Sequence, residues 1–423
     1  MALSRRKRTL RQGAIAKRSE PQTDWRNPDP QSRYDAIIIG GGGHGLATAY
    51  YLAKVHRLRR AAVLERGWIG EASWALPTVF GRGPDHADAA GLHEHAVSTF
   101  DDLAAELGYE TGVRRCGVVE VAMDGFGADA MHHAADLVRL AGGTAETLGH
   151  DATVGKLPLL ATLDSGEERH FEAVYYPNGG LAPSDQLAWA YGRAAEALGI
   201  DIVQNCEVTE VLIDGHKATG VMTDRGQIDA PIIAIAAEAY AGDVAAAAGF
   251  TLPIRARTIE LIATEPYAPI LEPAAISRSP DVNLCQMPSG EIVAWNGPGA
   301  YASRSPWGSG RQIDALLSET VRLVPGLGGA NVTRRWSASI DVTPDCHPLI
   351  GRAPIDGIFL NCGWGAGGYA ALPASGRLFA ELLGRFTVND LIAPFSPARF
   401  ASGSLLRPAM IPAELAVVGA SCF

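Results

Sequence analysis

Short apolar runs alternate along the chain with segments in which apolar residues recur at helical spacing. The first such unit begins with DAIIIG at residues 35–40, continues through a glycine-rich turn and an Ala/Leu/Tyr-rich segment, and ends with RRAAVLE at residues 59–65. Helical spacing recurs at residues 90–108 and 314–326. This order predicts a strand–turn–helix–strand unit of the nucleotide-binding type at the front of the chain.

The middle of the chain is richer in short strand patterns. β-branched or alternating runs occur at the following places: residues 115–123, 206–213, 257–265 and 291–297. They favour antiparallel pairing. The fold class predicted is therefore α/β, with a Rossmann-type cofactor domain interleaved with an α+β substrate domain built on an antiparallel sheet.

The most apolar stretch, residues 230–250, does not predict a membrane span. Glu238 and Asp243 interrupt it, and its two halves fit a buried strand followed by a short Ala-rich helix. We expect no membrane span in this chain.

Three glycines carry the first chemical signal. Gly40, Gly42 and Gly45 form G-x-G-x-x-G directly after an apolar run. Such glycines allow a tight turn, close approach of the backbone to a pyrophosphate, and close packing of helix on strand. Glu65 ends the next apolar run, where a carboxylate accepts hydrogen bonds from ribose hydroxyls. The unit predicts a dinucleotide site, and both NAD and FAD fit it.

A second glycine-rich segment favours FAD over NAD. Residues 357–376 read GIFLNCGWGAGGYAALPASG, which predicts another strand-to-helix turn far from the first. The N–H groups of such a turn can stabilise the negative charge that a flavin acquires on reduction. A tight strand–helix connection without a ligand is the alternative.

Charge and composition exclude several other functions. The chain has 423 residues and a net charge of -10, yet residues 1–18 hold seven basic residues and no acidic one. The acidic remainder would repel nucleic acid. The basic segment lacks a following apolar region, so we predict a basic flexible extension, with residues 19–33 as a linker, and a cytoplasmic protein.

No metal site is predicted. The cysteines form no C-x-x-C pair, and the histidine pairs His93/His95 and His132/His133 lack the spacing of metal ligands. We expect these histidines at the surface.

Long collinear motifs resemble one known family. They are WRNPDPQSRYDAIIIGGGGHGLATAYYLAK, AVLERGWIG, YGRAAEALGIDIVQNCEVT, DVTPDCHPLIGRAPIDGIFLNCGWGAGG and APFSPARFASG. From residue 25 onward the chain is similar to the beta subunits of heterotetrameric sarcosine oxidases, within the D-amino-acid oxidase superfamily. This resemblance implies a glutathione-reductase-like FAD domain, noncovalent FAD, oxidation of a secondary or N-methyl amine by hydride transfer to flavin, and partner subunits.

The resemblance also implies roles for particular residues. Arg82 falls where relatives bind a substrate carboxylate, a task suited to the fork of a guanidinium, and His347 is a candidate catalytic residue near the active site. Val208 falls where the backbone contacts adenine. The residues expected to bind the cofactor are Gly40, Gly42, Gly43, His44, Gly45, Glu65, Arg66 and Val208 around the ADP part, and Gly363, Gly365, Gly367 and Gly368 on the flavin side.

Three positions depart from the family pattern. Ala370 stands where relatives have a lysine that helps to bind the substrate carboxylate, a loss of about 1.5–3 kcal/mol, so sarcosine itself is not the favoured substrate. Ser184 replaces the histidine that carries covalent FMN in relatives, so we expect no covalent FMN there, while noncovalent FMN at a subunit interface stays open. An N-cap role for Ser184 is the alternative. Glu238 replaces a glycine near the cofactor, where it either crowds the pyrophosphate or points to solvent.

Two functional hypotheses follow. The first is FAD-dependent amine oxidation as the beta-type subunit of a sarcosine oxidase-like complex, acting on sarcosine, N-methylglutamate, an opine, proline or another amine, as oxidase or dehydrogenase. The second is a flavin-binding or assembly subunit with impaired catalysis. The predicted FAD domain comprises residues 34–85, 172–250 and 336–395, and the substrate domain residues 86–171 and 251–335, followed by a C-terminal tail at 396–423.

Overall fold

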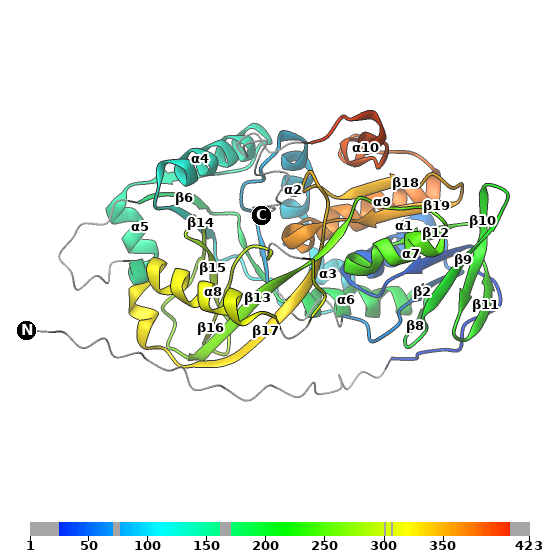
Figure 1. Ribbon diagram of the computed structural model, residues 1–423, viewed down its shortest axis with the longest axis horizontal. Helices are drawn as coiled ribbons and strands as arrows, with labels where there is room; N and C mark the ends of the chain where they lie inside the picture. Colours follow the sequence, from blue (N-terminus) through cyan, green and yellow to red (C-terminus); the bar gives the residue numbers. More distant parts are fainter. Residues whose placement is uncertain (1–24, 71–76, 161–170, 300–301, 306–307, 407–423) are drawn as a thin grey trace, which may run out of the picture.

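The fold contains two large sheets that lie side by side (Figure 1). The computed structural model describes residues 25–70, 77–160, 171–299, 302–305 and 308–406. Residues 1–24 and 407–423 lie outside the described residues. The predicted basic extension and the first part of the predicted linker fall there.

The smaller of these sheets forms the nucleotide-binding half. Its six strands run in the order β18-β19-β12-β1-β2-β8, with all neighbours parallel except β18 and β19. Their bounds are β1 Ala36–Ile39, β2 Ala61–Leu64, β8 Asp201–Val203, β12 Ile233–Ile235, β18 Leu349–Arg352 and β19 Ile358–Cys362. All four residues of β1 are buried, as is usual for a parallel strand covered on both faces.

Three helices cover one face of this sheet, and α1 packs between the other two. They are α1 Gly43–His56, α6 Ser184–Ala197 and α9 Leu372–Arg385. The other face carries α7 Ala241–Ala247 and a small antiparallel sheet of β9 Val208–Asp214, β10 Lys217–Thr223 and β11 Gly226–Asp229. The stretch at residues 230–250 thus contains a buried strand and a short helix, as predicted.

The larger sheet has eight strands in the order β17-β13-β16-β15-β14-β4-β6-β5. Its strands are β4 Val118–Ala122, β5 Glu146–Leu148, β6 Glu172–Tyr176, β13 Arg255–Pro266, β14 Ala274–Ser279, β15 Asp281–Gln286, β16 Glu291–Trp295 and β17 Val332–Val342. The neighbouring residues Val118 and Val119 belong to different hydrophobic cores. Val118 lies in the core that includes helix α4 Gly125–Leu140, and Val119 lies in the core that includes helix α8 Gly310–Leu323. Side-chain alternation therefore buries both faces.

The larger sheet is antiparallel apart from one parallel pair, β4 with β14. It includes β6 and the whole of β17, whereas residues 172–176 and 336–342 were predicted in the cofactor domain. The domain boundaries themselves stay a prediction.

The helical pattern at residues 90–108 divides into two helices, α2 Ala87–Thr99 and α3 Leu103–Leu107. The remaining elements are β3 Thr78–Phe80, β7 Gly180–Ala182, α5 His150–Lys156, α10 Ala398–Ser402 and the 3-10 turns η2 Pro158–Leu160, η3 Glu238–Tyr240, η4 Pro325–Gly329, η5 Gly365–Ala371 and η6 Ala393–Phe395.

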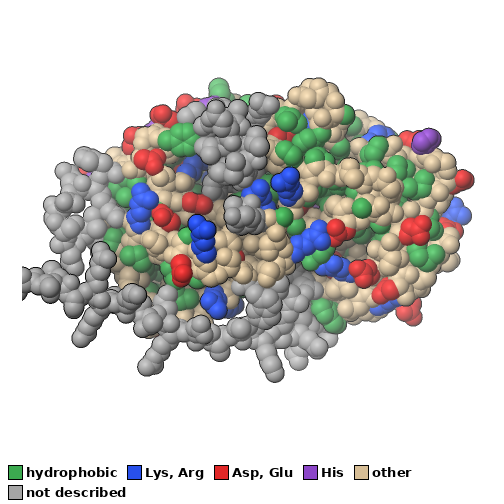
Figure 2. Space-filling model, viewed as in Figure 1, with side chains coloured by type: hydrophobic (Ala, Val, Ile, Leu, Met, Phe, Trp, Pro, Cys, Tyr) green, Lys and Arg blue, Asp and Glu red, His purple; other side chains and the backbone are tan. Residues whose placement is uncertain are grey.

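No helix in the described ranges is long and apolar enough to cross a bilayer. On the face seen in Figure 2, acidic side chains lie scattered among basic ones over the described residues.

Candidate active site

The first glycine turn lies between β1 and α1, and close backbone contacts account for its glycines. A Cβ on Gly45 would lie 2.0 Å from the carbonyl oxygen of Gly40, and one on Gly40 would lie 2.3 Å from that of Ala236. Gly40 also has a φ of 115°, which side chains disfavour. Helix α1 begins at Gly43, so its first N–H groups and the positive end of its dipole face this turn.

Glu65, directly after β2, reaches back to the same turn. Its Oε2 accepts a hydrogen bond from the N–H of Gly41 at 2.7 Å, and its Oε1 accepts one from Gly67 at 2.8 Å. The carboxylate is held beside the glycines, where the G-x-G-x-x-G unit places a ribose. Arg66 is exposed and stacks on the ring of Tyr240, with 3.4 Å between its Cζ and the ring centroid.

The second glycine segment follows β19. Gly363 has a φ of 76° and Gly365 one of 63°. The N–H groups of Gly363 and Trp364 donate to the carboxylate of Asp341, the latter at 3.1 Å. Burial raises the pKa of Asp341 to about 6. The segment then forms η5 and continues into α9, which confirms the strand-to-turn-to-helix order.

The two glycine segments meet. The hydroxyl of Tyr369, in η5, accepts a hydrogen bond from the N–H of Gly43 at 2.8 Å. The rings of His44 and Trp364 stack with centroids 4.5 Å apart. A Cβ on Gly368 would lie 2.6 Å from that of Trp364 and 3.0 Å from Nε2 of His44. The residues predicted on the two sides of one cofactor are therefore neighbours in the fold.

His44 is a buried turn residue. Its Nδ1 lies 2.9 Å from the hydroxyl of Ser375, and its Nε2 is buried without a hydrogen-bond partner. Burial lowers its pKa to about 3, so the imidazole is neutral at physiological pH.

Glu238 faces the first glycine turn rather than solvent. A Cβ on Gly42 would lie 2.8 Å from its Oε1, and that oxygen is buried without a hydrogen-bond partner. Burial, followed by the charges of Asp341 and Glu65, raises the pKa of Glu238 to about 8. This settles the direction in which the side chain points.

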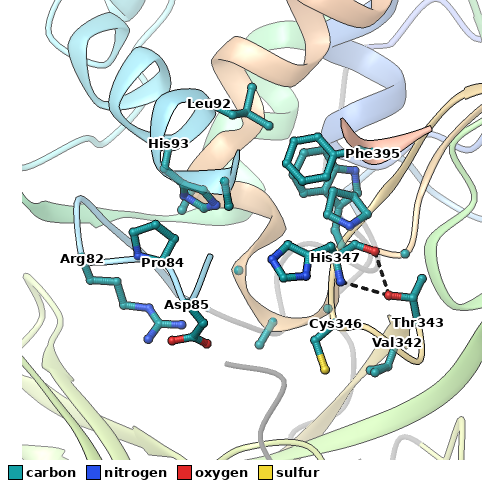
Figure 3. A pocket seen from close by; sticks show the side chains of 18 of the residues that line it. Arg82, Pro84, Asp85, Leu92, His93, Val342, Thr343, Cys346, His347 and Phe395 are labelled. Carbon is teal, nitrogen blue, oxygen red and sulfur yellow. Dashed lines mark hydrogen bonds between the residues drawn. The ribbon is translucent and has the colours of Figure 1, made fainter. Parts of the chain in front are cut away.

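A pocket adjoins the second glycine segment. Its lining comes from three parts of the chain and one further residue, Phe395. These parts are the loop before α2 together with α2 (Gly81–Asp85, Ala89, Leu92 and His93), the end of β17 and the loop after it (Val342, Thr343 and Cys346–Pro348), and the second glycine segment (Gly363–Gly367 and Ala370). Arg82, His93 and His347 point into it from separate parts of the chain (Figure 3). The structure thus brings the two predicted catalytic candidates to the flavin-side glycines.

Arg82 is the cation of this pocket. Burial, and next the charge of Arg278, lower its pKa, but a guanidinium keeps its charge at neutral pH. Asp85 lies near it in Figure 3, yet Asp85 accepts a hydrogen bond from Nη1 of Arg278 at 2.5 Å. Within the described residues, Arg82 itself forms no hydrogen bond or ion pair.

Arg278 and its partners form a buried network below the pocket. Its Nε donates to Oε1 of Glu120 at 2.6 Å, and the hydroxyl of Tyr176 donates to Oε2 of the same carboxylate at 3.1 Å. Both carboxylates near the pocket are therefore occupied by Arg278. Both carboxylates still act on Arg82 through their charge, but neither forms a hydrogen bond with it in the part of the chain that the structure describes.

Two histidines line the pocket, and both are neutral. The Nδ1–H of His347 donates to the carbonyl of Asp345 at 2.6 Å, and burial lowers the pKa of His347. Burial, and next Arg82, lower the pKa of His93 to about 4. The expectation that His93 lies at the surface is wrong, because helix α2 turns it toward the pocket.

The loop that carries His347 is fixed by a buried ion pair. Arg399 of α10 donates to both oxygens of Asp345, at 2.7 and 2.9 Å, and to the carbonyl of His347 at 2.9 Å. This geometry gives Asp345 a structural role, because both of its carboxylate oxygens are held by Arg399.

The other predicted positions lie as follows. Ala370 is buried and lines the pocket. Ser184 is buried at the first position of α6, and its Oγ lies 2.7 Å from the Oγ1 of Thr78. The prediction that Ser184 is the N-cap is wrong, because Pro183 occupies that position. Val208 begins β9, away from the pocket. The described residues contain no cluster of metal-ligand type.

The residues present fit FAD. The glycine turn offers N–H groups and leaves no room for side chains, and Glu65 lies beside it, where a ribose would be expected. Among the described residues, two buried polar atoms near the turn, Nε2 of His44 and Oε1 of Glu238, have no hydrogen-bond partner. The pocket and Asp341 adjoin the second glycine segment, where the flavin would be expected. Fold and site together define a dinucleotide-dependent oxidoreductase.

Comparison with protein families gives the same result. The chain belongs to the FAD dependent oxidoreductase family, abbreviated DAO, whose model matches residues 35–382. It is 35% identical to sarcosine oxidase subunit beta from Arthrobacter sp over 387 residues, covering 91% of this chain and 96% of that protein. It is 27% identical to glycine oxidase from Geobacillus kaustophilus, covering 87% and 97%.

Solved structures agree in fold. L-proline dehydrogenase from P. horikoshii matches with a TM-score of 0.79 at 23% identity, over 88% of this chain and 99% of that one. Glycine oxidase from Geobacillus kaustophilus matches with a TM-score of 0.77 at 25% identity, over 87% and 99%. The predicted family and fold class are confirmed.

Sequence reasoning missed four residues of the site. His93 was read as a surface histidine, and Tyr369, Asp85 and the stacking of Trp364 on His44 were not singled out. Helical spacing offers one usable signal: Ala89, Leu92 and His93 lie at i, i+3 and i+4 on one face of α2. No local pattern signals the contact between Tyr369 and Gly43.

Proposed function

We propose that this chain oxidises a secondary or N-methyl amine that carries a carboxylate, at the C–H bond next to the nitrogen. When bound, FAD supplies the redox chemistry by accepting a hydride equivalent. The observation that carries this proposal is Arg82, a half-buried cation without a hydrogen-bond or ion-pair partner among the described residues, in a pocket bordered by the flavin-side glycines.

Electrostatics explains why the ligand of Arg82 should be an anion. Asp85 and Glu120 act on Arg82 only through their charge, without a direct hydrogen bond, so a ligand carboxylate supplies the paired contact that the guanidinium lacks. A carboxylate matches the planar guanidinium in a bidentate arrangement. Since Arg278 occupies the nearby carboxylates, an amino acid binds without first breaking an internal ion pair.

The neutral histidines suit an amine substrate. An amine must be uncharged at nitrogen before it loses a hydride, and a neutral imidazole accepts a proton or a hydrogen bond from it. Asp345 fixes the Nδ1–H of His347 and leaves Nε2 as the ring atom able to accept. We therefore keep His347 as the candidate base and add His93.

Ala370 bears on the choice of substrate. It contributes no charge to the pocket wall, so Arg82 alone binds the carboxylate from the side of this chain. This favours a substrate with further contacts of its own, such as N-methylglutamate, an opine or proline, over sarcosine. Oxidase and dehydrogenase activity are both compatible with the pocket.

We further propose that the chain works as the beta-type subunit of a sarcosine oxidase-like complex in the cytoplasm. Curated relatives over about nine tenths of its length are named as beta subunits of sarcosine oxidase. FAD is expected to be noncovalent. Any FMN is expected at a subunit interface without a bond to Ser184, because a buried serine hydroxyl offers no ring nitrogen for attachment.

The test is flavin bleaching. The purified chain, loaded with FAD, is mixed anaerobically with a panel of secondary amines, and the oxidised flavin band is followed. We expect bleaching by a carboxylate-bearing amine and not by its carboxamide. Arg82→Ala should raise the concentration needed by about tenfold or more, since a charged hydrogen bond contributes about 1.5–3 kcal/mol.

Arg385→Ala is the matched control, because Arg385 is exposed on α9 and forms only a loose pair with Glu381. Equal bleaching of the acid and its amide by the wild-type chain would contradict the role of Arg82. A flavin band that no amine bleaches, alone or with partner subunits present, would favour the alternative of a flavin-binding or assembly subunit.

A further inference from the structure

One acidic side chain stands at the phosphate turn and needs an explanation. Glu238 has a φ of 45°, in the left-handed region that glycine adopts most readily. Its Oε1 is buried, has no hydrogen-bond partner in the part of the chain that the structure describes, and lies 2.8 Å from the point that a Cβ on Gly42 would occupy. The carboxyl group therefore lies against the part of the turn that approaches a pyrophosphate most closely.

An ionised carboxylate would oppose cofactor binding there. Two like charges in a site of low dielectric repel strongly, and a pyrophosphate carries negative charge on both phosphates. A protonated carboxyl behaves differently, because its O–H donates a hydrogen bond to a phosphate oxygen. Which form Glu238 takes decides whether it hinders or helps.

The surroundings of Glu238 favour the protonated form. Asp341 of β17 and Glu65 after β2 add negative charge, and burial acts in the same direction, raising the pKa to about 8. The basic side chains nearby are engaged elsewhere: Arg66 and Arg304 stack on Tyr240, and Arg304 pairs with Asp243 at 2.6 Å.

Of the remaining neighbouring elements, β13 carries two cations, Arg257, whose guanidinium is engaged elsewhere, and the exposed Arg255. Apart from Arg255, the charged or titratable groups on them are neutral His44 on α1, Tyr369 in η5, Arg257 of β13, which donates to the carbonyl of Gly299, and Glu260 of β13, which accepts from the N–H of Ser309. None of the hydrogen bonds among them involves Glu238. A bound pyrophosphate would favour the protonated form further.

We propose that Glu238 binds the FAD pyrophosphate as a neutral carboxylic acid, so that this chain takes up a proton with the cofactor and binds FAD less tightly at alkaline pH. The inference rests on FAD at the first glycine turn. It assigns to Glu238 a binding role that a glycine at this position cannot have. FAD occupancy then becomes sensitive to pH.

The test measures the dissociation constant of FAD, not turnover. The apo-protein is titrated with FAD between pH 6 and pH 9.5, and quenching of flavin fluorescence gives the affinity. Loss of one bound proton predicts that the wild-type affinity falls about tenfold per pH unit above the pKa of Glu238 in the apo-protein. Glu238→Gln keeps the shape and an N–H donor but cannot ionise, so its affinity should stay level over this range.

Two further measurements sharpen the result. Calorimetry at pH 9 in buffers of different ionisation enthalpy should show uptake of nearly one proton by the wild-type chain and none by Glu238→Gln. Glu210→Gln, an exposed change on β9, is the matched control and should behave as wild type. Asp341 remains in every variant, so its own titration cannot produce the difference.

Three outcomes would overturn the inference. If the FAD affinity of the wild-type chain, like that of Glu238→Gln, does not change with pH, then the carboxyl group does not contact the phosphates. Failure of the wild-type chain to bind FAD at pH 6, with tight binding by Glu238→Gln and Glu238→Gly, would show that the carboxyl excludes the cofactor. If neither the wild-type chain nor any variant binds FAD, the proposed FAD site is contradicted. The proposed reaction is tested separately, by the bleaching of the flavin with amines.

Discussion

Placing a lysine at position 370 tests how this pocket recognises its substrate. Ala370 is 6% exposed and shares the pocket wall with Arg82, and the family resemblance puts a carboxylate-binding lysine there. Ala370→Lys would add a second charged donor. At about 1.5–3 kcal/mol for a charge-assisted hydrogen bond, the affinity for a small amino acid such as sarcosine should rise about ten- to a hundredfold.

The structure also predicts a cost to this substitution. Both carboxylates near the pocket are held by Arg278, so the new ammonium would face Arg82 without an internal counter-ion. The free variant should therefore be less stable than the wild type, and a carboxylate ligand should restore part of the loss. Thermal unfolding with and without the ligand measures this difference.

The assay is the half-saturating concentration of sarcosine for anaerobic flavin bleaching. Ala370→Met is the matched control, because methionine has a comparable length and no charge. If Ala370→Lys binds sarcosine no better than Ala370→Met does, then position 370 does not reach the substrate carboxylate, and the reasoning from the pocket fails.

Three further predictions concern stability and the cofactor. Gly45→Ala places a methyl group 2.0 Å from the carbonyl oxygen of Gly40. The purified variant should lose bound flavin, and its free energy of unfolding should fall by about 1–3 kcal/mol, which a lower unfolding temperature would report. Glu120→Gln leaves Arg278 with one carboxylate, and urea unfolding should show a loss of about 3–5 kcal/mol. Because the folded pKa of Glu238 lies above its ordinary value, the unfolded chain releases that proton first, and the apo-protein should lose stability relative to Glu238→Gln as pH rises from about 4.5 to about 8.

Local patterns were enough to predict the fold class. The apolar run of β1, the glycines after it and the carboxylate after β2 are short-range features whose geometry follows from backbone sterics, and the structure confirms their order. The strand runs of the larger sheet were also recognisable. The assignment of β6 and β17 was not, because pairing between distant strands depends on partners that no local window contains.

The same limit separates the predicted from the missed residues of the site. Arg82 and His347 were chosen by resemblance, and the fold brings both to one pocket. The neutrality of His93 follows from burial beneath elements remote in sequence, and no spacing within α2 contains that information. Charge state in a pocket is thus a property of tertiary structure rather than of sequence pattern.

The contact between the two glycine segments predicts that the proposed cofactor and substrate sites are coupled in this chain. Tyr369 accepts a hydrogen bond from Gly43 at the start of α1, and Ala370, the next residue, lines the pocket. A change at either residue therefore acts on both sites through a single turn of η5. For this reason the lysine variant at position 370 must be assayed for flavin content as well as for substrate affinity, since only a gain at unchanged flavin content reports on the carboxylate.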